Sequence, residues 1–175
     1  MNSKPGYRFW QFLQSLRRSP GENDWEMVKA ILLPEELTLF QQLPVPDQNH
    51  SLRVLKSVQS QGESDHDYLK ATLLHDIGKT RAPLRRWERV FSVLVTALFP
   101  GRVKIWGEGN PTGLQRPLVT IQKHSHWGAE LARMAGSSPR VVWFIQNHEL
   151  EDPEGSPSER DLSLLRKLQT ADNNN

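Results

Sequence analysis

Helical periodicity runs through almost the whole sequence and restricts the possible folds more than any other feature. Apolar residues recur three, four and seven positions apart, the spacing that places them on one face of an α-helix. The first two sets are Phe9, Phe12, Leu13 and Leu16, followed by Val28, Ile31 and Leu32. Further helices are expected at residues 34–43, 47–61, 65–77, 83–99, 117–135, 139–149 and 158–172. The sequence therefore predicts an all-α protein.

Residues that start and stop helices stand near the ends of these spans. Proline, which fits the first helical turn, occurs at positions 83, 117, 139 and 157. Ser158 with Asp161 three positions later resembles a capping box. Glycine, which often follows the last turn, occurs at positions 62, 78 and 136.

The segment from Gly101 to Arg116 differs from the rest because it contains four glycines and one proline. Val103 and Ile105 in this segment suggest a brief extended stretch. We therefore predict one long loop or small hairpin inserted near residues 101–116. Such a loop could cover a functional site or be a plain surface insertion.

A chain of 175 residues is long enough for one domain with a short extension. We expect residues 1–46 to form an N-terminal helical extension packed on a domain of residues 47–175. An alternative is that residues 1–46 form an amphipathic element that docks on a membrane or a partner, with Phe9, Trp10 and Phe12 facing the interface.

Composition excludes several classes of protein. The 22 basic and 20 acidic residues are too balanced to indicate binding to a DNA or RNA polymer. Cysteine is absent, so any metal must be held by His, Asp, Glu and water. The longest apolar run, Val90 to Phe99, is far shorter than the about 20 residues of a membrane span. We expect no signal peptide before Arg17-Arg18, and a cytoplasmic location.

Four of the six histidines share a helix face with apolar residues and should point inward. They are His50, His75, His124 and His148. Asp172 follows Leu165 and Leu168 on the expected buried side of the last helix. His126 lies on a polar stripe and His66 at a helix start, so both should be solvated.

A single histidine on an apolar face is more often a satisfied core residue than a metal ligand. Several buried imidazoles and carboxylates are different, because each costs several kcal/mol unless it finds a partner or a cation. The intervals from His50 to His75, His124 to His148 and His148 to Asp172 are 25, 24 and 24 residues. Each interval holds one helix and its connection, so successive helices could present ligands to a common metal centre.

The adjacent pair in Leu74-His75-Asp76-Ile77-Gly78-Lys79 identifies a family. The chain resembles the HD-domain superfamily of metal-dependent phosphohydrolases, of the HDIG type, from about Asn49 to Asp172. His50 resembles the first ligand of that family, and His124 resembles the histidine that stands four residues before a Gly-Ala pair. His148 and Asp172 are similar to the ligand on the following helix and to the closing aspartate.

The resemblance implies a divalent metal ion, one or two in number, of Mn, Fe, Co, Ni or Zn. A first ion would be bound by His50, His75, Asp76 and Asp172, and a second by His124 and His148, with Asp76 as the bridge. A metal-activated water would then attack phosphorus in a small-molecule phosphoester, expected to be a nucleotide. Asp76 is thus a catalytic candidate, and Lys79 is a candidate phosphate contact, with a solvated basic helix end as the alternative.

Two departures from the family argue against one of its branches, while the identity of the substrate stays open. Members that hydrolyse cyclic dinucleotides have paired histidines before a glutamate and then Gly-Tyr-Pro, whereas here Asn147 precedes His148 and residues 155–157 read Gly-Ser-Pro. The motifs are closer to the branch that splits diadenosine polyphosphates. A non-catalytic HD module that binds a nucleotide or a protein partner in signalling remains the alternative. The oligomeric state stays open.

Overall fold

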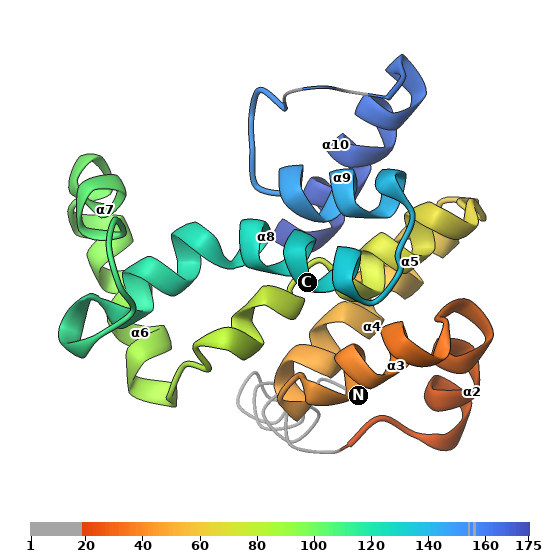
Figure 1. The fold of residues 1–175 in the computed structure, drawn as a ribbon, viewed down its shortest axis with the longest axis horizontal. Coiled ribbons are helices and arrows are strands. Elements are labelled where there is room, and N and C mark those ends of the chain that lie inside the picture. Colours follow the sequence, from red (N-terminus) through yellow and green to blue (C-terminus); the bar gives the residue numbers. More distant parts are fainter. Residues whose placement is uncertain (1–18, 154, 156) are drawn as a thin grey trace, which may run out of the picture.

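The computed structural model describes residues 19–153, 155 and 157–175 (Figure 1). Throughout these residues the chain forms helices joined by turns and loops, without a strand, which confirms the all-α prediction. The helix expected around Phe9 to Leu16 lies outside the described residues. The α-helices are α2 (Glu22–Ile31), α3 (Pro34–Gln42), α4 (Val45–Ser60), α5 (His66–Leu74), α6 (Arg86–Leu98), α7 (Pro100–Trp106), α8 (Arg116–Met134), α9 (Pro139–Asn147) and α10 (Glu159–Asn173). The described residues also form the short 3-10 helices η1 (Ile77–Arg81) and η2 (Gly113–Gln115).

Side-chain caps fix the starts of three helices around the core. Asp65 accepts a hydrogen bond from the backbone N–H of Tyr68 at the start of α5, and Ser138 caps α9 in the same way. At the start of α10 the N–H of Asp161 donates to Ser158 Oγ, and that hydroxyl donates to the Asp161 carboxylate at 2.8 Å. These caps satisfy backbone donors that a helix start otherwise leaves without partners.

The core is formed where α4, α5, α9 and α10 meet. Helix α5 packs against α4 and α9, α10 packs against α4, and α8 packs against α9. The largest fully buried side chains include Leu55, Tyr68, Phe144 and Leu165. Because α4, α5, α8, α9 and α10 all contribute to this packing, the polar residues at their inward ends are held close together.

Helices α2 and α3 join the same core. Val28 and Phe40 are fully buried, and both helices contact α5. Glu36 on α3 is also buried, with its carboxylate 3.1 Å from Lys70 Nζ on α5 and 2.7 Å from Ser137 Oγ. The boundary between an extension and a domain near residue 46 stays a prediction, and the alternative docking role of Phe9, Trp10 and Phe12 falls outside the described residues.

The segment near residues 101–116 differs from the prediction in its local structure. Pro100–Trp106 forms helix α7, so the extended stretch expected at Val103 and Ile105 was wrong. Pro100 occupies the first turn, where backbone N–H groups have no partner within the helix, so the missing N–H of proline costs nothing there. This position favours a helix over a strand. A loop is confined to residues 107–112.

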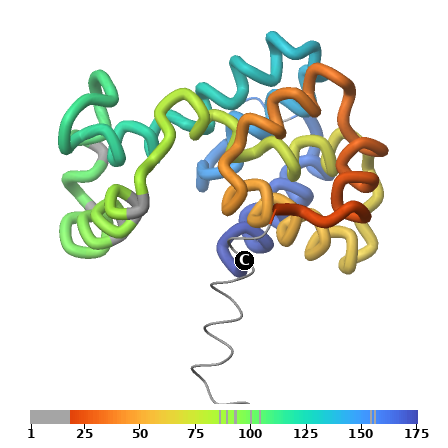
Figure 2. The backbone as a smooth tube through the Cα atoms, turned by 90° about the horizontal axis from the view of Figure 1, so that it is seen from below, coloured from red at the N-terminus to blue at the C-terminus, as the bar shows by residue number. Residues whose placement is uncertain are grey.

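Helices α6 and α7 form an arm that stands apart from α4, α5, α9 and α10 in both views (Figures 1 and 2). We call residues 85–106 the α6–α7 arm. It connects to the rest of the protein through contacts of α6 and α7 with α8. Among the described residues, no helix combines the length and apolar content needed to cross a membrane.

Candidate metal centre

The structure brings together all six residues that the sequence predicts as metal ligands. His50 lies on α4, His75 and Asp76 follow α5, His124 lies on α8, His148 follows α9, and Asp172 lies on α10. Two groups of ligand atoms each lie within 4.8 Å of one another. The first group consists of His50, His75 and Asp76, and the second of Asp76, His124 and His148.

Asp172 adds a carboxylate to the first group. Its Oδ1 lies 2.6 Å from His50 Nε2 and 3.4 Å from His75 Nε2. His75 Nε2 is also 3.7 Å from Asp76 Oδ2. The first group therefore offers two imidazole nitrogens and two carboxylates.

The second group is built on α8 and on the residue after α9. Nε2 of His124 lies 3.2 Å from Nε2 of His148 and 3.4 Å from Asp76 Oδ1. The two oxygens of Asp76 thus face different groups, since Oδ2 is near His75 and Oδ1 is near His124. This single carboxylate connects the two groups.

Three of the histidines are held in the same orientation by backbone carbonyls. His75 Nδ1 lies 2.9 Å from the carbonyl oxygen of Thr72, and the corresponding distances for His124 and His148, to the carbonyls three residues earlier, are both 2.7 Å. A carbonyl oxygen can only accept, so Nδ1 must carry the proton, and a neutral ring then has a lone pair on Nε2.

These Nε2 atoms fit a cation. In His124 and His148 the two lone pairs face each other at 3.2 Å, where neither ring can donate to the other. In His75, Nε2 is buried and has no hydrogen-bond partner among the described residues. Nitrogen and carboxylate donors converging in this way match the ligand preferences of Mn, Fe, Co, Ni and Zn.

Burial and neighbouring charges shift the pKa values of the residues in both ligand groups. Burial, followed by the charges of His124 and His75, lowers the pKa of His148 to about 3, which leaves that ring neutral at pH 7. Burial alone would lower the pKa of His75, but Asp76 and Asp172 raise it to about 9. Burial also works against ionised Asp76, yet Lys79 and His75 hold its pKa well below the ordinary value. The first group therefore attracts positive charge.

Two glycines allow η1 to lie directly on α8 and so bring Asp76 to His124. A Cβ atom on Gly78 would stand 1.8 Å from the carbonyl oxygen of His124 and 2.6 Å from the backbone nitrogen of Gly128. A Cβ on Gly128 would stand 3.0 Å from Ile145 Cγ2. Gly78 was expected to stop a helix, but α5 has already ended at Leu74, and its role is this close backbone contact.

Lys79, the predicted phosphate contact, lies at the rim of the centre. Its Nζ is 2.6 Å from Asp76 Oδ2, and only part of the side chain is exposed. Burial lowers the pKa of Lys79, but the charges of Asp76 and Asp47 outweigh burial and raise it. Asp47, a buried residue one helical turn before His50 on α4, was not predicted from the sequence. The spacing of three residues, which places Asp47 on the same helix face as His50, could have indicated it.

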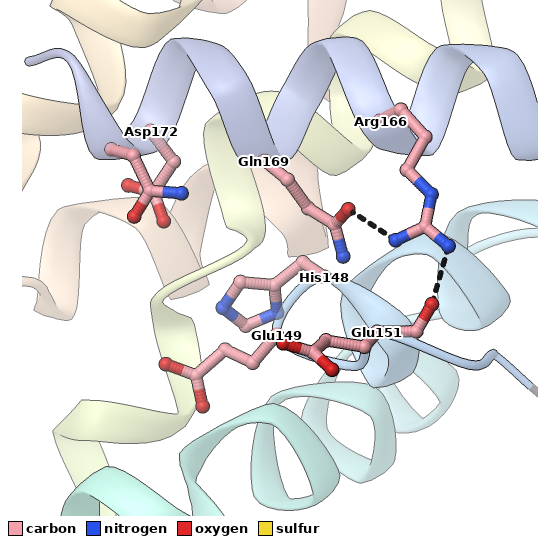
Figure 3. A pocket seen from close by; sticks show the side chains of 7 residues that line it. His148, Glu149, Glu151, Arg166, Gln169 and Asp172 are labelled. Carbon is pink, nitrogen blue, oxygen red and sulfur yellow. Dashed lines mark hydrogen bonds between the residues drawn. The ribbon is translucent and has the colours of Figure 1, made fainter.

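A pocket of about 310 Å³ opens beside His148 and Asp172 (Figure 3). Arg166 on α10 donates hydrogen bonds to Gln169 Oε1 and to the backbone carbonyl of Glu151. The pocket is lined by His148, Glu149, Glu151, Arg166, Gln169, Asp172 and Asn173. The sequence analysis did not single out Arg166 or Gln169. Gln169 stands three residues before Asp172 on the same face of α10, and this spacing could have indicated it. Arg166 stands six residues before Asp172, which is not a same-face spacing.

The two remaining histidines lie outside the centre. The side chain of His126 is 65% exposed and lies 3.2 Å from Glu130 on the same helix. His66 is an exposed residue at the start of α5. Glu149, in contrast, is close to the second group, with Oε1 3.6 Å from His124 Nε2.

Comparison with known proteins assigns the family. The sequence profile described as HD domain matches residues 48–173, and the chain therefore belongs to the HD-domain family. Members of this superfamily are generally metal-dependent hydrolases. Comparison with curated proteins and with solved structures returned no match. The family match covers the residues of both ligand groups and Asp172.

Proposed function

We propose that this protein is a metal-dependent phosphohydrolase that acts on a nucleotide or a related small phosphoester. The observation that supports this most directly is the division of Asp76 between two ligand groups, each completed by imidazole nitrogens. Such a paired arrangement suits the hydrolysis of phosphoesters, in which charge develops on two oxygens at once.

In this proposal His50, His75 and Asp172 hold one divalent ion, His124 and His148 hold another, and Asp76 contributes an oxygen to each. When bound, such ions lower the pKa of coordinated water and stabilise the charge on a phosphoryl group under attack. The carbonyls of Thr72, Ile121 and Ile145 keep the three rings in the tautomer that presents Nε2 to the centre.

The pocket beside the centre supports a substrate of nucleotide size. Its volume of about 310 Å³ is at the lower end of the range for small-molecule sites. Along α10, Arg166 stands six residues from Asp172, which corresponds to about 9 Å of helix. We propose that a phosphoryl group binds near Asp172 and Lys79 while a second anionic or polar group of the same substrate reaches Arg166.

Elemental analysis coupled to an activity screen tests the proposal. The purified full chain is expected to contain Mn, Fe, Co, Ni or Zn, to lose turnover with a chelator, and to regain it when one of these metals is restored. Aryl phosphates, phosphodiesters and nucleotides serve as substrates, and Asp76→Asn serves as the variant that loses the shared ligand. Bound metal without turnover of any substrate would favour a non-catalytic HD module, and absence of metal would contradict the proposed centre.

A further inference from the structure

Helix α6 buries two polar residues on one face and exposes a stripe of apolar residues on another. Glu88 and Ser92, one helical turn apart, are buried. Val90, Leu94 and Leu98, also one turn apart, are 61%, 55% and 69% exposed. A helix that only packed on its own protein would show the opposite arrangement, because burial of apolar side chains is the main source of packing free energy.

The buried polar face of α6 is satisfied by the protein itself. Glu88 accepts a hydrogen bond from the backbone N–H of Arg85 at 2.6 Å and lies 3.7 Å from a guanidinium nitrogen of Arg116. This pair ties α6 to the start of α8. Glu88 therefore faces α8, and the residues Val90, Leu94 and Leu98 are left exposed.

The apolar surface continues beyond α6. Trp87 and Phe99 are exposed at the two ends of the stripe, and Ile105 on α7 is 66% exposed. These residues all lie in the α6–α7 arm, which stands apart from α4, α5, α9 and α10 in both views (Figures 1 and 2). An apolar face of this kind on a projecting arm marks an interaction surface.

The excess of basic residues in the α6–α7 arm indicates a negatively charged partner for this apolar surface. Residues 85–104 contain five basic residues and one acidic residue, whereas the whole chain has a net charge of only +2. The one acidic residue, Glu88, is buried and already paired with Arg116. Arg85 and Arg102 are exposed near the two ends of the apolar stripe, and Arg102 lies over the ring of Trp106 at 5.9 Å.

We propose that the α6–α7 arm docks on an anionic phospholipid surface. Leu94, Leu98 and Ile105 enter the boundary between headgroups and acyl chains, while the exposed arginines near the ends of the stripe meet lipid phosphates. A tryptophan at an end of the stripe matches the preference of this side chain for the membrane interface. A second copy of the chain is disfavoured, because symmetric pairing would bring two positively charged arms together.

Vesicle sedimentation of the full chain tests this proposal independently of metal and activity. The probes are vesicles of phosphatidylcholine alone and vesicles that also contain phosphatidylglycerol. We expect binding only to the anionic vesicles, and weaker binding as salt is raised. The double variant Leu94→Gln/Leu98→Gln should lose at least about tenfold in partitioning, since both side chains are exposed and neither supports the core.

The matched control is Met134→Gln, which removes another apolar side chain, 81% exposed, at the end of α8 away from the arm. This variant should bind vesicles like the wild type, and circular dichroism should show equal helix content for all three proteins. Equal binding by the double variant would overturn the proposal, as would binding that ignores lipid charge. Dimers that dissociate in the double variant, without vesicle binding, would also overturn it and would assign the surface to a second copy.

Discussion

At the scale of single residues, His124 and His126 are two positions apart on α8 but have different surroundings. His124 Nε2 faces His148 and Asp76 in a buried group, whereas the His126 side chain is 65% exposed. We expect His124→Ala to lose bound metal and at least about 100-fold of activity, because a ligand is removed. His126→Ala should stay within about twofold of wild type, because an exposed ion pair contributes little.

Metal content and phosphoester turnover, measured side by side on the two variants, test whether His124 and not His126 is the metal ligand. Circular dichroism provides the control for folding. Equal losses in both variants would show that the wrong histidine of the pair has been placed in the centre.

The sequence predicts which histidines approach the centre because each shares a helix face with apolar residues that must be buried. His50, for example, lies on the face of Val54 and Val58, both fully buried. Arg166 could not be found in this way, since it is a charged residue whose pairing with the carbonyl of Glu151 depends on a loop that the helical pattern does not specify.

At the scale of elements, the contact between η1 and α8 controls the position of Asp76. Gly78→Ala would place a Cβ atom 1.8 Å from a backbone oxygen, and a backbone atom cannot rotate away as a side chain can. We expect a loss of about 3 kcal/mol or more in the free energy of unfolding, together with weaker metal binding as Asp76 moves from His124. Urea denaturation and metal titration measure the two effects.

Gly101→Ala is the matched control for this prediction. Gly101 lies in α7, and no atom stands within 4 Å of the point that a Cβ there would occupy. A helical alanine at this position should be neutral or stabilise by up to about 1 kcal/mol. Similar losses in both variants would mean that the contact between η1 and α8 is not what makes position 78 special.

A second junction of elements is centred on Arg140 at the start of α9. Its guanidinium lies 2.6 Å from Asp65, the cap of α5, and 2.6 Å from Asp161 on α10. The hydrogen bond from Arg140 lowers the pKa of Asp65 below the ordinary value of 3.8. The unfolded chain therefore takes up a proton first as the pH falls, so this stabilisation is present above about pH 4 and is lost as the pH falls through the folded pKa.

We expect Arg140→Met to lose about 1–3 kcal/mol in the free energy of unfolding at pH 7, and the difference from wild type to shrink toward pH 3. Urea denaturation over this pH range measures it. Asp65→Asn is the control, because asparagine still caps α5 but has no charge to titrate. A difference that stays constant with pH would show that Arg140 acts by packing alone.

Local sequence signals predict elements well where caps and apolar faces agree, as they do for α9 and α10. They were wrong at Pro100–Trp106, where Val103 and Ile105 suggested an extended stretch. Glycine-rich flanks and β-branched residues favour a strand, but Pro100 provides a helix start and no neighbouring strand is available among the described residues. The structure of this segment is decided by its neighbours as much as by its own composition.

At the scale of the whole molecule, the candidate centre connects helices that are far apart in sequence. His50 and Asp172 are in contact although 122 residues separate them. The family pattern and the intervals of 24 or 25 residues between His50 and His75, His124 and His148, and His148 and Asp172 predict this convergence. Helical periodicity alone does not, because it gives the inward face of each helix but not which faces meet.

Because the ligands come from α4, α5, α8, α9 and α10, bound ions would together connect five helices in the folded state only. A ligand that binds only the folded protein stabilises it, by about 2.7 kcal/mol when its concentration is 100 times Kd. For a chain of this size we expect chelation to lower Tm by about 5–10 °C. Differential scanning calorimetry before and after chelation, with elemental analysis of both samples, measures this change.

Asp76→Asn provides the control for the chelation experiment, because it removes the carboxylate that serves both ligand groups. The Tm of this variant should not respond to the chelator. An unchanged Tm in wild-type protein whose metal has demonstrably been removed would show that the histidine lone pairs are satisfied without a cation.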